Sequence, residues 1–161
     1  TLKNAIIITR WLLIQLARLH ARDYIHRDIK TNNIMVTRNL HLKLIDFGIS
    51  CSVAPKNKLL QCPQSLSGTP GYIAPELANW TFLKNPGKYL KTGDNFAAGV
   101  TIYVLLTGRF PYRFNPVTFQ ITGPLQPLKT GTCLDPVING LLVLDPDRRL
   151  TAVEALGMLN C

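Results

Sequence analysis

His26-Arg27-Asp28-Ile29-Lys30-Thr31-Asn32-Asn33 is the stretch of sequence on which the interpretation of the chain depends. It fits the pattern H-R-D-x-K-x-x-N and brings together two cations, a carboxylate and two amides. The stretch lies between an apolar segment that predicts a helix and two short segments typical of β-strands. Loops held by such a scaffold often carry catalytic groups, so these residues are candidates for an active site.

The segments on either side predict the scaffold. Apolar residues recur at helical spacing through the first 22 residues, which predicts an amphipathic helix over 1–22. The face of this helix is expected to consist of Leu2, Ile6, Leu13, Leu16 and His20. Residues 34–36 and 42–45 are β-prone and are separated by a short polar stretch, which predicts a hairpin.

The second half of the sequence is expected to be helical. Residues 50–70 have no period and predict a long surface segment. Asp94 precedes the apolar run 96–106, which predicts a central helix that Gly108 ends. Asp135 and the proline after it are expected to open another helix, and Thr151 with Glu154 form a capping box before the last one. The fold class is therefore mainly α with a small β-hairpin.

Composition limits the classes of protein to consider. The 161 residues carry 18 Lys and Arg against 9 Asp and Glu, a net charge of +9, and 47% of them are hydrophobic. This is enough for one domain with a core, and the longest apolar run is too short to cross a membrane. The four cysteines show no metal-ligand or disulfide-framework spacing, so an intracellular protein without a disulfide scaffold is expected. The basic residues form no dense block, so nucleic-acid binding is not expected.

Further motifs follow the first stretch in a fixed order. Eighteen positions after Asp28 comes Asp46-Phe47-Gly48, and residues 68–76 read Gly-Thr-Pro-Gly-Tyr-Ile-Ala-Pro-Glu. Later, residues 145–151 read Asp-Pro-Asp-Arg-Arg-Leu-Thr. Together these stretches resemble the C-terminal lobe of a eukaryotic-type Ser/Thr protein kinase. The resemblance covers nearly the whole chain, 1–161, and implies an enzyme that uses ATP and Mg²⁺.

The resemblance assigns roles to individual residues. Asp28 would orient the hydroxyl of a protein substrate and accept its proton, and Lys30 would place a positive charge against the transferring phosphate. Asn33 and Asp46 would supply oxygen ligands to Mg²⁺, with phosphates and waters completing the coordination. Met35 would contact adenine from below, although it could equally be a core residue of the hairpin.

Other residues are expected to have structural or regulatory roles. His26 and Phe47 resemble two members of an apolar stack anchored on Asp94, and Thr69 is expected to form hydrogen bonds near Asp28 and Lys30. Glu76 and Arg149 resemble a buried ion pair. The activation segment would run over 46–76, and Ser65 or Ser67 could accept a phosphate from an upstream kinase.

The resemblance also fixes the expected domain organisation. The parts are a first helix (1–22), a catalytic loop with the Mg²⁺-binding hairpin (23–48), the activation segment and a helical subdomain (94–161), in which 110–133 is too rich in Pro and Gly for a regular docking helix. No G-x-G-x-x-G occurs, and only 27 residues precede Asp28, so the sequence holds no nucleotide-binding N-terminal lobe. Two functions are compatible with this: a fragment of a Ser/Thr kinase, or a catalytically incompetent lobe that binds proteins.

Overall fold

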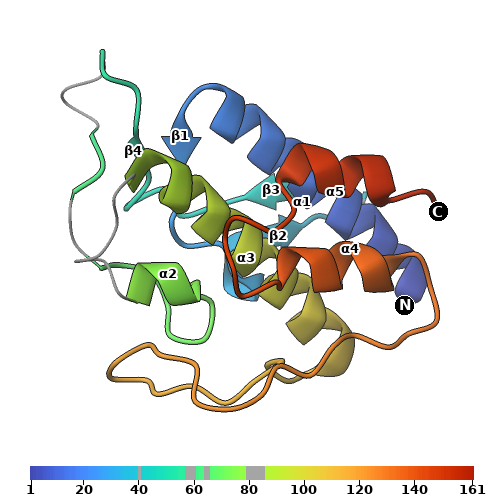
Figure 1. Ribbon diagram of the computed structural model, residues 1–161. Helices are drawn as coiled ribbons and strands as arrows, with labels where there is room; N and C mark the ends of the chain where they lie inside the picture. The colour runs from blue at the N-terminus through green and yellow to red at the C-terminus, as the bar shows by residue number, and fades with distance from the viewer. Residues whose placement is uncertain (40, 57–60, 64–65, 79–85) are drawn as a thin grey trace.

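The computed structural model is mainly helical with two small sheets, and it describes residues 1–161 except 40, 57–60, 64–65 and 79–85 (Figure 1). The predicted fold class is confirmed. The helices are α1 (Leu2–Ala21), α2 (Pro75–Ala78), α3 (Pro86–Thr107), α4 (Leu134–Leu141) and α5 (Ala152–Met158), and a 3₁₀ turn covers Thr31–Asn33. Within the described residues, no helix is both long and apolar enough to span the membrane.

Helix α1 packs one face into the core of the molecule. Thr1 caps its N-terminus, where the hydroxyl accepts a hydrogen bond from the Asn4 N–H at 3.3 Å. The buried face consists of Ala5, Thr9, Leu12, Leu13 and Leu16. The predicted face was therefore partly wrong, because Leu2 is 41% exposed and the buried positions are shifted around the helix axis from the predicted ones.

Helix α3 lies at the centre of the fold, between α1 and α4 (Figure 1). It begins at Pro86, about ten residues before the predicted apolar run 96–106. The additional turns are mostly polar and give no apolar period. They are nevertheless packed, because Leu90 is buried and Gly93 lies against Leu77 so closely that a β-carbon would collide with it. Asp94 consequently lies within the helix and does not precede it.

The strands form two separate antiparallel pairs. Strands β2 (Ile34–Val36) and β3 (Leu42–Leu44) form the predicted hairpin, with Met35 opposite Lys43. Strands β1 (Tyr24–Ile25) and β4 (Cys51–Ser52) form a second pair that the sequence did not predict. This second pair fastens the start of the expected activation segment to the residues just before the catalytic loop.

Helices α4 and α5 complete the domain. The predicted capping box of α5 is present, since Thr151 and Glu154 exchange hydrogen bonds of 3.1 Å. The predicted start of α4 was wrong: this helix begins at Leu134, and Asp135 is not its cap. The Asp135 carboxylate instead accepts hydrogen bonds from the loop before the helix, from the N–H groups of Thr130 and Gly131.

All four cysteines are paired, which corrects the expectation of a chain without disulfides. Cys51 is bonded to Cys62, and Cys133 to Cys161. The spacing of the cysteines did not indicate these two disulfides, because it is the fold that brings together residues 11 and 28 positions apart in the sequence. Cys51 lies in β4 and Cys62 in the segment that returns beside it, where the Cys62 N–H donates to the Ser52 carbonyl at 3.2 Å.

Candidate active site

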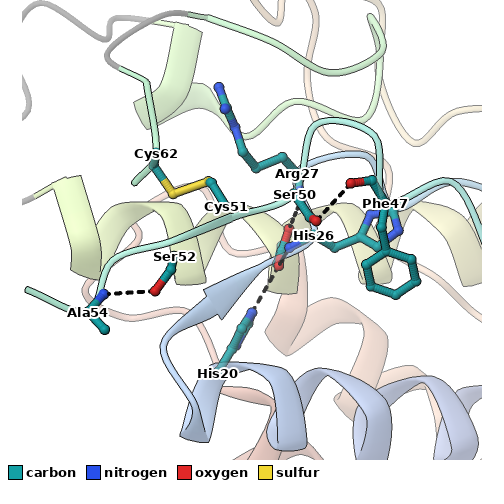
Figure 2. The surroundings of a disulfide bond; sticks show 10 residues. His20, His26, Arg27, Phe47, Ser50, Cys51, Ser52, Ala54 and Cys62 are labelled. Carbon is teal, nitrogen blue, oxygen red and sulfur yellow. Dashed lines mark hydrogen bonds and ion pairs between the residues drawn. A yellow bond between two sulfur atoms is a disulfide. The ribbon is translucent and has the colours of Figure 1, made fainter. Parts of the chain in front are cut away.

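The catalytic loop is held by one carboxylate of helix α3. Asp94 is buried and accepts hydrogen bonds from the N–H groups of His26 and Arg27, each at 2.9 Å. The same carboxylate contacts Nε2 of His20, at the end of α1, at 3.0 Å (Figure 2). Arg27 has a φ of 74°, a conformation that is unfavourable for a non-glycine residue and that these contacts fix in place.

His26 connects the catalytic loop to the Asp46-Phe47-Gly48 stretch. Its Nδ1 accepts a hydrogen bond from the Asp28 N–H at 3.1 Å, so Nε2 carries the proton and donates to the Ile45 carbonyl at 3.0 Å. Its ring also packs edge-on against the Phe47 ring, with the centroids 4.7 Å apart (Figure 2). The predicted structural role of His26 is thereby confirmed.

Asp28, Thr69 and Lys30 form a compact polar cluster. The Thr69 hydroxyl donates to Asp28 Oδ1 at 2.7 Å and accepts a hydrogen bond from Lys30 Nζ at 3.0 Å. Lys30 Nζ also lies 3.8 Å from Asp28 Oδ2. The predicted role of Thr69 is confirmed. The arrangement fixes a carboxylate and an ammonium side by side, which is what positioning a hydroxyl near a phosphate requires.

Asn33 contacts Asp28 and directly precedes strand β2, and Asp46 follows β3, the strand that pairs with β2. Asn33 Nδ2 donates to the Asp28 carbonyl at 2.7 Å, so its Oδ1 is not used in this contact. The Ile45 N–H donates to the Asn33 carbonyl at 2.9 Å, and Asp46 comes next with a φ of 58°. Asp46 is exposed, and its Oδ1 accepts a hydrogen bond from the Gly48 N–H at 3.3 Å.

These two residues offer hard oxygen donors of the kind Mg²⁺ prefers. No group of three or more His, Cys, Asp or Glu side chains suited to a metal ion occurs in the part of the chain that the structure describes. An ion held by Asn33 and Asp46 would therefore take its remaining ligands from phosphates and water. The donor set fits a metal that arrives with a nucleotide.

Met35 is half-exposed, with 50% of its surface accessible, so it is not a core residue of the hairpin. Val36 and Phe47 are exposed to a similar degree, at 48% and 45%. These exposed apolar side chains on strand β2 and in the loop after β3 are each available to a ligand or to another part of a protein.

Of the two expected phosphorylation positions, only Ser67 lies within the described residues. Its Oγ is buried and has no hydrogen-bond partner among the residues that the structure describes. It borders a small cavity of about 30 Å³ that Arg27 and Asp94 also line. Burial lowers the pKa of the Arg27 guanidinium, and the neighbouring Asp94 partly offsets this effect. Ser65 lies outside the described residues.

The predicted ion pair between Glu76 and Arg149 is present and buried. Arg149 Nη2 donates to Glu76 Oε2 at 2.9 Å, and Nη1 donates to Oε1. The pair joins the end of the expected activation segment to the loop before α5 and includes none of the candidate catalytic residues, so its role is structural.

Comparison with known proteins agrees with this geometry. The family model described as "Protein kinase domain" matches residues 2–159. This chain belongs to the protein kinase family. The human phosphorylase b kinase gamma catalytic chain, liver/testis isoform, is 36% identical to it over 159 residues, which cover 92% of this chain and 38% of the human one.

Kinases of other organisms are similar over the same part of the chain. CBL-interacting protein kinase 25 of Oryza sativa subsp. japonica is 36% identical over 152 residues, covering 91% of this chain and 28% of its own. Serine/threonine-protein kinase cds1 of Schizosaccharomyces pombe is 30% identical over 158 residues, which cover 92% of this chain and 34% of the yeast protein. The chain thus spans about two-fifths or less of the length of these relatives, and their names support a Ser/Thr protein kinase.

Two contacts of this kinase lobe were not predicted from the sequence. The His20 contact with Asp94 adds a second element to the support of the catalytic loop. The Tyr112 hydroxyl donates a hydrogen bond to the Gly71 carbonyl, in the segment that follows Thr69. Neither His20 nor Tyr112 belongs to a recognisable motif. The sequence indicated only that His20 lies in a helix and that Tyr112 is aromatic.

Proposed function

We propose that this chain is the C-terminal lobe of a Ser/Thr protein kinase which, in a complete catalytic domain, transfers the γ-phosphoryl group of ATP to a hydroxyl of a protein substrate. The observation that carries the proposal is the cluster in which the Thr69 hydroxyl joins Asp28 to Lys30, at 2.7 and 3.0 Å. Phosphoryl transfer depends mainly on positioning and on neutralising charge, and this cluster is built for both tasks.

Each residue of the cluster has a definite task. Asp28 orients the attacking hydroxyl and accepts its proton. The Thr69 hydroxyl donates to its carboxylate, and the Asp28 N–H donates to His26 Nδ1 and so holds the backbone in place. Lys30 supplies a positive charge that stabilises the negative charge spread over the transferring group. Asn33 and Asp46 would hold Mg²⁺, which when bound neutralises phosphate charge. Lys30 two positions after Asp28 is the family pattern for Ser/Thr substrates.

Regulation by phosphorylation belongs to the same proposal. Arg27 precedes Asp28, and a phosphate on the activation segment could pair with it. Ser67 is a poor acceptor in this conformation because its Oγ is buried. Ser65 is therefore the position we propose for an upstream kinase.

A second function is favoured by the exposed apolar side chains of Met35, Val36 and Phe47. A lobe with this surface and no nucleotide-binding partner lobe would bind other proteins without transferring phosphate. The two functions differ in one respect that can be measured, namely transfer that depends on Asp46.

The test is transfer of radiolabelled phosphate from ATP, with Mg²⁺, to a generic Ser/Thr substrate. It uses these 161 residues joined to the N-terminal lobe of a complete kinase, beside matched Asp46→Asn and Asp28→Asn variants. Transfer that both substitutions abolish supports the proposal, whereas a folded chimaera without transfer supports the interaction module. The 161-residue chain alone should transfer phosphate far more slowly, because contacts to the phosphates from a second lobe are missing.

The other expectations stay predictions. The basic surface carries no recognition motif, so we still expect neither nucleic-acid nor membrane binding. The intracellular location also stays a prediction, and the two disulfides remove the argument from cysteine spacing that supported it.

A further inference from the structure

A second hollow lies apart from the proposed catalytic cluster, at the C-terminal end of α3. Its volume is about 780 Å³, and none of Asp28, Lys30, Asn33 or Asp46 lines it. The hollow is lined by the end of α3 and by the irregular segment 109–126, which lies along the lower edge of the molecule in Figure 1. Its principal lining residues are Tyr103, Arg109, Phe110, Tyr112, Arg113 and Gln126. As predicted, no helix forms over 110–133.

The wall of the hollow is ordered by its own hydrogen bonds. The N–H groups of Thr122 and Gln126 donate to the carbonyls of Arg113 and Pro111, at 2.8 and 2.7 Å. The turn of this segment is held by Asn115, whose Oδ1 accepts from the Val117 N–H at 2.8 Å. Because these bonds hold the two sides of the segment together, a ligand would meet a preformed surface and pay little ordering entropy.

The hollow is positively charged. Arg109 and Arg113 are exposed, and within the described residues neither guanidinium makes an ion pair. The sequence contains no Asp or Glu at all between Asn95 and Leu134. Guanidinium groups match carboxylates in geometry and can bind them through two parallel hydrogen bonds, and Arg with aromatic side chains is typical of protein-binding surfaces.

Contacts connect the wall of the hollow to the catalytic cluster. The Tyr112 hydroxyl donates to the Gly71 carbonyl, two residues after Thr69, which itself contacts Asp28. The Phe110 ring packs edge-on against Tyr72, with the centroids 5.2 Å apart. A chain bound in the hollow would therefore lie beside the segment that borders the catalytic loop.

We propose that this hollow docks an acidic segment of the protein substrate, with its carboxylates on Arg109 and Arg113 and an apolar side chain against the aromatic wall. The inference rests on the proposed kinase function and adds to it a substrate class. Docking at a distance from the reacting hydroxyl raises the local concentration of that hydroxyl near Asp28.

The experiment measures binding without ATP. A short fluorescein-labelled peptide rich in Glu, with one Phe in its middle, is titrated with the 161-residue chain and followed by fluorescence anisotropy. The double variant Arg109→Gln and Arg113→Gln should bind about tenfold more weakly, as expected for the loss of two solvent-accessible ion pairs. Added salt should weaken binding of the unsubstituted chain more than that of the variant.

A matched control removes two other exposed arginines of the same charge. Arg18→Gln with Arg22→Gln, at the end of α1, should leave binding of the peptide unchanged. An equal loss in this control, equally tight binding of a peptide with Gln in place of Glu, or binding of an oligonucleotide but not the peptide would each overturn the proposal. Since the assay contains no ATP, its failure overturns docking alone, whereas failure of the phosphotransfer assay overturns the proposed function.

Discussion

Arg149 and Glu76, 73 positions apart in the sequence, meet in a buried two-pronged ion pair. The Arg149 side chain is 0% exposed and that of Glu76 7%. The remaining donors of the guanidinium are also satisfied, with Nε bonded to the Val143 carbonyl at 2.9 Å. The guanidinium also lies over the Phe96 ring, with 4.8 Å between its carbon and the ring centroid. Glu76, at the end of the expected activation segment, is thus fastened to the loop before α5.

Removing one partner of this pair should destabilise the whole domain. Glu76→Gln leaves a buried guanidinium without its counter-charge, and the free energy of unfolding should fall by about 3–5 kcal/mol. Urea denaturation followed by circular dichroism measures the difference. As a control, Glu76→Leu combined with Arg149→Met should be more stable than Glu76→Gln, since no charge is left buried. A Glu76→Gln protein as stable as the original would show that the pair is solvated.

Thr69 should control the rate of phosphotransfer through the two groups that it joins. In the chimaeric catalytic domain, Thr69→Val removes the hydroxyl that donates to Asp28 and accepts from Lys30. We expect kcat to fall about tenfold to a hundredfold, because the carboxylate and the ammonium lose their mutual alignment. Steady-state kinetics measure this fall, and Thr69→Ser, which keeps the hydroxyl, should retain most of the rate. An unchanged kcat in Thr69→Val would remove Thr69 from the catalytic arrangement.

The sequence predicted the proximity of the candidate catalytic residues better than the contacts that support them. Asp28, Lys30 and Asn33 lie within one short stretch, so their proximity follows from local geometry. The Glu76–Arg149 pair was also predicted, because both residues belong to motifs. The contact of His20 with Asp94 joins positions 74 apart, and nothing in the local sequence of either residue signals the other. The early start of α3 at Pro86 was missed because Leu90 is buried by tertiary contacts, which the local sequence does not reveal.

The disulfide between Cys51 and Cys62 should stabilise the activation segment. It closes a loop of 11 positions, for which the loss of chain entropy in the unfolded state corresponds to about 3 kcal/mol. Cys62→Ser should therefore lower the free energy of unfolding by up to about 3 kcal/mol under non-reducing conditions. Urea denaturation with and without a reductant measures it. If Cys62→Ser and the original chain unfold at the same urea concentration without reductant, the two thiols are not bonded in solution.

The Asp135 carboxylate should make stability depend on pH on the acid side. Partial burial alone would raise its pKa, but hydrogen bonds from Thr130 and Gly131 outweigh this and hold the pKa below the ordinary value of 3.8. As the pH falls, the unfolded chain therefore takes up the proton first. The contribution of Asp135 is fully present above about pH 5 and is lost as the pH falls through its lower folded-state pKa.

Asp135→Asn tests this sign. The amide cannot reproduce the pattern in which both carboxylate oxygens accept hydrogen bonds, at 2.9 Å from the Thr130 N–H and 2.8 Å from the Gly131 N–H. The variant should unfold at lower urea concentration than the original chain near neutral pH, and the difference should shrink as the pH falls through the folded-state pKa of Asp135, which lies below 3.8. As a control, Thr151→Ala removes a helix cap that has no titrating group of its own, and it should lower the free energy of unfolding by about 1 kcal/mol near neutral pH. This decrease should not shrink at low pH in the way expected for Asp135→Asn. A difference for Asp135→Asn that stays constant down to low pH would mean that the loop before α4 does not depend on the charge of this carboxylate.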